Sequence, residues 1–477
     1  MIVAFKPRTS EITLLIVSAA VISLLFVDFL WIVVLGIVFL IILLRYQKNF
    51  YIIFSFFTLI TVTTGLSASL RLLVQLVSIA LLFYFSLKVY KLDYRNYPKI
   101  PKSITILVLL ILSAMLISTL FSDYPRTGMI QILRTSFFFL IVYLFYSLIE
   151  SEKELQLYLF VLVVTAISLF LLVAYLFYLA NFDVIEFQKF LFIEEDKNYI
   201  HKNTIGALFV LTISILLAYY FSLSNKTRKR LISLTILLLV IGLIITNARA
   251  AIFSLIISTI FILYVLNKKA FYKLLIVIVI IVPILFIEPV NELINFYFRL
   301  DRIFTGRDVI LQATYQIIAN NPIFGTGPAA AKIEMGKNIP FLMGSTDWLF
   351  LNHHIESIGM GHAHDFYLFF LSELGILGFI SSIAIPVVFF KLGYDTLKLI
   401  QSTEKKYYSI VVGLNAAGLA VFTRGFFEWG GIVSYGKIAS DLPFWWCFII
   451  LIYINKMFSS DIRNRASIPF KQDNSLN

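Results

Sequence analysis

The chain consists of long apolar blocks separated by short polar or charged segments. A helix that crosses a bilayer needs about 20 mostly apolar residues. Cutting the sequence at charge clusters and at Gly, Pro or Asn breaks predicts about 12–14 transmembrane helices, because the short neighbours at Asp28 and at Asn247–Arg249 can instead form re-entrant hairpins. The predicted spans begin near Ile12, Leu30, Phe50, Leu72, Ile104, Ile130, Leu155, Thr204, Leu231, Ala251, Leu274, Phe366, Ser409 and Leu442. The fold class is therefore an all-α polytopic membrane protein.

Composition supports this class and excludes others. The 477 residues are 60% hydrophobic and 14% charged, whereas soluble domains carry about 25% charged residues. The net charge of +12 does not indicate nucleic acid binding, because the basic residues form short clusters between apolar blocks. The single cysteine, Cys447, excludes disulfides within the chain and a metal site built from several cysteines.

Charge placement predicts the orientation of the chain. Most of the 39 Lys and Arg fall in alternate loops, and most acidic stretches fall in the others. Since basic loops stay on the cytoplasmic side, we expect both termini in the cytoplasm and a multi-pass protein of the cytoplasmic (inner) membrane. The first ten residues run directly into an apolar block, which we interpret as an uncleaved first span.

One outer segment is too long to be a simple connection. Residues 288–365 have a helical pattern at Val309, Ile310, Tyr315, Ile317 and Ile318, and they hold four of the five histidines. Long loops in compact proteins are usually functional or disordered. We predict an ordered periplasmic or extracellular catalytic loop over residues 288–365, between N-terminal transmembrane helices (1–287) and C-terminal transmembrane helices with a cytoplasmic tail (366–477).

Arginines near the outer ends of spans are candidates for phosphate binding. Arg249 separates two spans, where it either snorkels to the interface or points into an outward cavity and binds a phosphate. Arg302 precedes an amphipathic helix that Thr305 or Gly306 can cap, which places Arg307 in its first turn. A helix N-terminus next to an arginine favours an anion. The Gly325-Thr326-Gly327 turn that follows is either a plain turn or a place where backbone amides approach a ligand.

Histidines supply candidate proton acceptors. His362 and His364 precede the span that contains Glu373, and each histidine is interpreted as a general base, a structural residue or a zinc ligand. Asp365 or Glu373 can orient such a base. His201 and Lys202 start another span, where they can bind anionic headgroups or make a second phosphate contact. No phosphate-binding loop of nucleotide enzymes and no dinucleotide fingerprint is present, which argues against a nucleotide-sugar donor and an ATP-driven pump.

Four motifs around this loop resemble the O-antigen ligase and polymerase superfamily. They are His-Lys-Asn-x-x-Gly at the start of a span, x-Ala-Arg-Ala-Ala between two spans, Gly-Arg before a helix and Asn-Pro-x-x-Gly-x-Gly, and His-x-His-Asp leading into Glu-Leu-Gly-x-x-Gly. The resemblance extends over residues 201–378. The family usually has Asn where this chain has Asp365.

The resemblance implies a metal-independent inverting glycosyltransferase with a helical membrane fold and no cofactor. Its donor would be an undecaprenyl-pyrophosphate-linked oligosaccharide at the outer face. Arg249 and Arg307 would hold the pyrophosphate, and His364 would serve as the base. Arg302, His362, Lys202, His201 and Asp365 are the remaining candidates for substrate binding. Besides the lipid bilayer, a flippase and a chain-length regulator are expected partners, and nucleic acid is not.

Three functions remain as alternatives. The favoured one is a polymerase that joins lipid-linked repeat units into a surface polysaccharide such as O-antigen, capsule or exopolysaccharide. The second is an O-antigen ligase that transfers the polysaccharide to lipid A-core. The third, from another class, is a transporter or flippase, which we disfavour because ionisable residues gather in outer loops and no internal repeat is visible.

Overall fold

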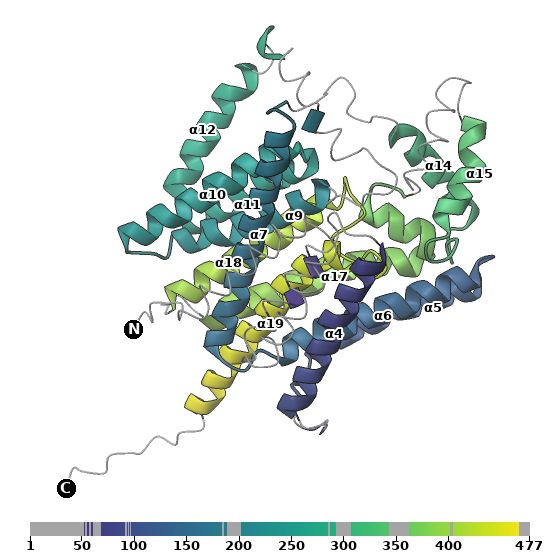
Figure 1. Cartoon of the computed structure of the whole chain (residues 1–477), viewed down its shortest axis with the longest axis horizontal. Coiled ribbons are helices and arrows are strands. Elements are labelled where there is room, and N and C mark those ends of the chain that lie inside the picture. Colours follow the sequence, from purple (N-terminus) through teal and green to yellow (C-terminus); the bar gives the residue numbers. More distant parts are fainter. Residues whose placement is uncertain are drawn as a thin grey trace.

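The chain is described by a computed structural model. It covers residues 68–90, 97–183, 202–284, 307–342, 362–400 and 404–466, with a few more near 52–60, 93–95, 186–187 and 287–291. Within these residues the elements are helices and no strand occurs, which confirms the all-α prediction. The helices, labelled as in Figure 1, are α4 (Ala68–Tyr90), α5 (Lys102–Leu120), α6 (Pro125–Ser147), α7 (Glu152–Leu179), α9 (Lys202–Tyr220), α10 (Lys226–Thr246), α11 (Arg249–Leu266), α12 (Lys268–Ile284), α14 (Arg307–Asn320), α15 (Ala331–Leu342), α17 (Phe366–Ile400), α18 (Lys405–Arg424) and α19 (Ile438–Ala466).

Apolar block length accounts for most of these helices. Every predicted span from Leu72 onward coincides with one of them, and eight described helices are long and apolar enough to cross a membrane. The predicted spans that begin near Ile12, Leu30 and Phe50 lie largely outside the described residues, so the total of 12–14 stays a prediction. The chain is a multi-pass membrane protein.

The boundary between α10 and α11 is a tight turn. Asn247 has a φ of 49°, in the left-handed region that ends many helices, and its amide donates to the Ile244 carbonyl at 2.9 Å. The helices on either side have 21 and 18 residues. Each is therefore long enough to be a separate span, which favours two spans over a re-entrant hairpin.

The bundle is organised around α9, α18 and α19. Helix α18 packs against both α9 and α17, and α9 also contacts α7, α10 and α11. In α19 the fully buried Trp446 stacks on Tyr158 of α7 with ring centroids 4.1 Å apart, and its indole N–H donates to the Tyr158 carbonyl at 2.9 Å. The starts of α9 and α17 and the end of α18 consequently come together at one end of the bundle.

Helix α17 is broken near that end. Gly375 has φ 62° and ψ −154°, outside helical geometry, so the Ser372 and Glu373 carbonyls lose their usual partners in the helix. The amides of Thr326 and Gly327 donate to these carbonyls at 3.1 and 2.9 Å. In return the Ile376 amide donates to the Ile323 carbonyl at 3.2 Å. The turn at 323–327 therefore replaces the missing helical bonds, as a break in an apolar helix requires.

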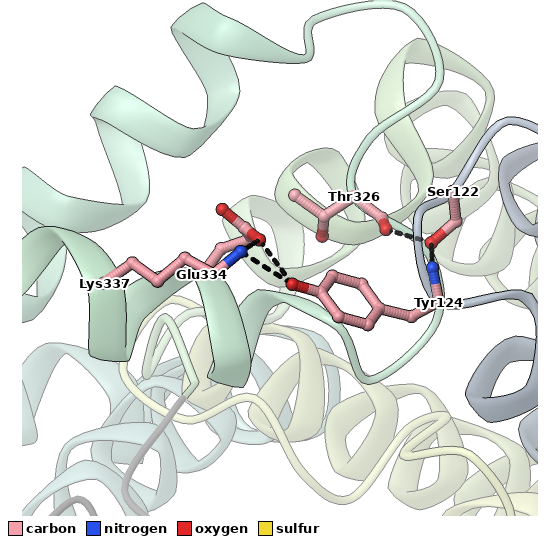
Figure 2. A network of polar contacts seen from close by, with 5 residues as sticks. All are labelled: Ser122, Tyr124, Thr326, Glu334 and Lys337. Carbon is pink, nitrogen blue, oxygen red and sulfur yellow. Dashed lines mark hydrogen bonds and ion pairs between the residues drawn. The ribbon is translucent and has the colours of Figure 1, made fainter.

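A polar clasp fixes this turn and α15 to the α5–α6 connection (Figure 2). The Ser122 hydroxyl donates to the Thr326 carbonyl at 2.5 Å and accepts from the Tyr124 amide at 3.0 Å. The Tyr124 hydroxyl donates to Glu334 at 2.9 Å and accepts from Lys337 at 2.7 Å. Lys337 also forms an ion pair with Glu334 at 2.7 Å. The clasp joins parts of the chain about two hundred residues apart.

Candidate active site

The His-x-His segment lies directly before α17. Asp365 caps this helix, since its Oδ1 accepts the amides of Tyr367 and Leu368, each at 2.8 Å. Burial raises the pKa of Asp365, and the two amides oppose that rise. Asn and Asp are equally good N-caps. The Asp at this position therefore preserves the structural role that an Asn would have.

His364 faces a carboxylate that the sequence did not single out. Its Nδ1 lies 4.0 Å from Oε2 of Glu428, and the side chains are 19% and 6% exposed. The other carboxylate oxygen of Glu428 accepts a hydrogen bond from Asn203 at 2.7 Å, at the start of α9. His364 has a φ of 50°, a conformation that is uncommon for residues other than glycine and that occurs preferentially at functional sites. The pair joins the starts of α9 and α17 with the end of α18.

His362 is in a different environment. Its ring lies against Trp429 with centroids 3.9 Å apart and meets Phe369 edge-on. Burial, followed by the charges of Lys437, His364 and Lys332, lowers the pKa of His362 to about 3. An imidazole with that pKa is a poor proton acceptor near neutral pH. Of the two histidines, His364 has the surroundings of a base.

Arg249 and Lys202 occupy the first turns of two adjacent helices. A Cβ on Gly206 of α9 would lie 2.7 Å from the Ala248 Cβ and 3.0 Å from the Ala251 Cβ, so these first turns are in close contact. Arg249 and Lys202 are both half-buried. One turn after Arg249, Phe253 packs edge-on against Phe427, the residue before Glu428, at 5.7 Å.

Arg307 is the first residue of α14, as the sequence predicted, which places it at the helix N-terminus. The orientation of its side chain is not among the described features. Arg302 and His201 lie outside the described residues, as do Thr305 and Gly306. The structure therefore brings Arg249, Lys202 and His364 to one end of the bundle.

Two interpretations of the sequence are corrected. The turn amides of Thr326 and Gly327 bind the broken α17 and not a ligand. Glu373 is fully buried, and its Oε2 accepts the Ala329 amide at 2.6 Å, which holds the turn that leads into α15. Neither Glu373 nor Asp365 orients a histidine in the described structure, because both carboxylates accept backbone amides there. Glu428 is the acid that faces His364.

The segment that carries Glu428 is fixed by buried polar groups. Asp441, at the start of α19, accepts the amides of Gly431 and Ser434 at 3.1 and 2.5 Å and the Ser434 hydroxyl at 2.7 Å. Arg424, at the end of α18, donates to the Gly430 carbonyl at 2.7 Å. A sequence signal for this site exists, since Arg424 and Glu428 are charges that directly follow an apolar block.

Within the described residues, no group of three or more His, Cys, Asp or Glu is placed to hold a metal ion. His353 and His354 lie outside those residues. The arrangement offers an imidazole whose Nδ1 lies 4.0 Å from a carboxylate, at the end of the bundle where α9 and α11 begin. A histidine in such a position is suited to proton transfer.

Comparison with protein families finds a match between residues 234–383 and the model described as O-antigen ligase. This region contains Arg249, Arg307 and His364, and it ends before Glu428. No curated protein matches the chain.

Proposed function

We propose that this chain, which its family match places in the O-antigen ligase and polymerase superfamily, is a membrane polymerase that joins undecaprenyl-pyrophosphate-linked oligosaccharides into a surface polysaccharide. The reaction takes place at the outer face of the cytoplasmic membrane, with both termini in the cytoplasm. The family match supports a ligase-type glycosyltransferase activity, and the polymerase assignment goes beyond it.

The observation that carries the proposal is that His364 faces Glu428, which is hydrogen-bonded to Asn203 at the start of α9. Its Nδ1 faces Glu428 at 4.0 Å, which leaves Nε2 for a substrate hydroxyl. A carboxylate in this position favours one tautomer and stabilises the imidazolium that forms on proton transfer. Arg249, at the start of α11, supplies positive charge for an anionic group nearby.

The reaction follows from these groups. An acceptor hydroxyl attacks the anomeric carbon of the donor sugar from the face opposite the pyrophosphate, which inverts the configuration. The bond between that carbon and the pyrophosphate oxygen breaks, and the electron pair leaves with undecaprenyl pyrophosphate. His364 takes the hydroxyl proton. Arg249 and Arg307 stabilise the charge that develops on the leaving group. No metal ion takes part, so we expect EDTA to leave the activity intact.

The test is transfer by purified protein supplied with an undecaprenyl-pyrophosphate oligosaccharide, with and without lipid A-core. A ladder from the donor alone supports the polymerase. A single shift that requires lipid A-core would replace it with the ligase alternative. Movement of the donor across vesicle membranes without transfer would favour the flippase.

Variants locate the chemistry. We expect His364→Gln to lower the rate constant about 100- to 10,000-fold, which is the usual contribution of a general base. His362→Gln is the matched control and should retain most of the activity. Arg307→Ala should abolish transfer while membrane insertion stays normal. Equal losses for both histidine variants would contradict the assignment of His364.

A further inference from the structure

A second group of cations lies near His362, the first histidine of the His-x-His segment. It consists of Arg134 in α6, Lys332 in the first turn of α15 and Lys437 directly before α19. At Gly436, where φ is 73°, a Cβ would lie 2.7 Å from the Arg134 carbonyl. The backbone next to Lys437 is therefore pressed against α6 at the level of Arg134.

Aromatic contacts connect this group to the candidate active site. The Lys437 amino group lies 4.2 Å from the centroid of the Trp429 ring, and the same ring packs on His362. Although part of the Lys437 side chain is exposed, removal of water by the surrounding protein lowers the pKa of its amino group. The positive charges of Arg134 and Lys332 lower the pKa of Lys437 further.

Nearby acids attract Lys437 but form no ion pair with it in the described residues. Glu373 and Asp441 attract Lys437, but both are fully buried and their carboxylates accept backbone amides. Within the described part of the chain, no ion pair joins any of the three cations to a carboxylate. Arg134 contacts the neutral side chain of Gln131 at 3.4 Å. Both Arg134 and Lys332 are exposed and can reach a ligand.

We propose that Arg134, Lys332 and Lys437 form a second anion site, which binds the phosphate or pyrophosphate headgroup of the acceptor lipid. Its role as an acceptor site rests on the proposed transferase function. During transfer the donor loses its pyrophosphate, whereas the acceptor keeps its own headgroup. Two anionic groups must therefore be held at once on either side of the reacting atoms.

The geometry fits that requirement. His364 faces Glu428, which accepts a hydrogen bond from Asn203 at the start of α9. Helix α9, which Lys202 begins, packs against the first turn of α11, where Arg249 lies. His362, two residues earlier, faces Trp429 and the Lys437 side. The proposed donor cations are thus connected to His364 through Glu428 and α9, and the proposed acceptor cations to His362 through Trp429.

The first experiment counts bound lipid without turnover. Protein in phosphatidylcholine nanodiscs is titrated with undecaprenyl pyrophosphate, and the complexes are resolved by native mass spectrometry. We expect two lipids per wild-type chain and one for the Arg134→Gln/Lys332→Gln double variant. Arg249→Ala should also bind one. A double variant that still binds two lipids, or a wild type that binds one, would overturn the proposal.

Lys337→Gln is the matched control. Lys337 is exposed on the same helix as Lys332, but it is paired with Glu334 and Tyr124 at the clasp. The control variant should bind two lipids. Phosphatidylglycerol is then added at the same concentration as the probe, and it should displace neither lipid. Displacement of the second lipid would identify a general anionic-lipid site and overturn the acceptor assignment.

The second experiment separates donor from acceptor kinetics. Loss of charged hydrogen bonds to the headgroup should raise the KM for the acceptor about 10- to 100-fold in the double variant, with the KM for the donor unchanged. An increase in the KM for the donor alone would refute the assignment of these residues to an acceptor site. Since the lipid count needs no catalysis, failure of the transferase proposal would leave two bound lipids but no transfer. If the proposed second site is wrong, the wild type would still catalyse transfer but would bind one lipid per chain.

Discussion

Replacement of Gly375 by alanine tests whether the break in α17 holds the outer end of the bundle together. Gly375 has φ 62° and ψ −154°, a region of backbone space that is essentially restricted to glycine. A Cβ at this position would come closer than 3.0 Å to the Ile323 carbonyl and to the Phe324 amide nitrogen, both of which are backbone. Backbone atoms cannot move aside as a flexible side chain can, so either the turn or the helix must shift.

The magnitude follows from what that shift breaks. If α17 straightens, the chain loses the bonds from Thr326 and Gly327 to α17 and the bond from Ile376 to Ile323. Three such bonds contribute about 0.5–1.5 kcal/mol each. Two ordinary helical bonds are recovered. If α17 stays bent, the strain at a non-glycine residue costs about 1–3 kcal/mol before the clash is counted. We therefore expect Gly375→Ala to lower the free energy of unfolding by about 1–3 kcal/mol.

Thermal unfolding in detergent measures this effect, with Gly336→Ala as the matched control. Gly336 is an exposed position in α15, and a Cβ there would meet nothing within 4 Å. Because alanine is the better helix former, the control should be neutral or gain about 0.5–1 kcal/mol. A Gly375→Ala protein that unfolds at the wild-type temperature, or a control that is destabilised equally, would refute the account of the kink.

Three further predictions concern single side chains. Asp365→Ala should lower the free energy of unfolding by about 1 kcal/mol through loss of the α17 cap, whereas Asp365→Asn should not, and equal losses in chemical unfolding would contradict the capping role. Because the pKa of His362 is about 3 in the fold and 6.5 when unfolded, the unfolded chain binds the proton first, so stability should fall as the pH drops from 6.5 toward 3, by at most about 1.4 kcal/mol per pH unit. In thermal unfolding, His362→Phe should show less acid sensitivity than wild type, and identical pH profiles would count against a buried neutral imidazole. Tyr124→Phe should release α15 from the α5–α6 connection and speed limited proteolysis within residues 331–342, with unchanged cleavage arguing against the clasp.

The helices could be predicted from the sequence because the bilayer imposes a simple rule of length and apolarity. The sequence predicted Arg307 in the first turn of α14 because Thr305 or Gly306 can cap a helix that begins there. The break in α17 could not be predicted in the same way. The Glu-Leu-Gly motif lies within an apolar block, and its geometry depends on a turn about fifty residues earlier that supplies replacement hydrogen bonds.

The candidate site was predicted in part. The sequence drew attention to His364 and Arg249, which the fold brings to one end of the bundle, whereas Arg302 and His201 lie outside the described residues. Glu428 was missed because its significance arises only when the end of α18 meets the starts of α9 and α17. Motifs that are continuous in sequence reveal local geometry, and a pair such as His364 and Glu428 becomes visible only in three dimensions.

The hydrogen-bond partners of the carboxylates around the site affect how well it can stabilise a departing pyrophosphate. Asp365, Glu373 and Asp441 all accept backbone amides and thereby fix helix starts and turns. Glu428 is the acid that faces a histidine in the described structure, and one of its oxygens is occupied by Asn203. An active site that expels a pyrophosphate would be slowed by free carboxylates, since they would repel both the substrate and the leaving group. Because these acids accept hydrogen bonds from backbone amides and exposed arginine and lysine side chains lie nearby, the site favours an anionic substrate and leaving group, as this reaction requires.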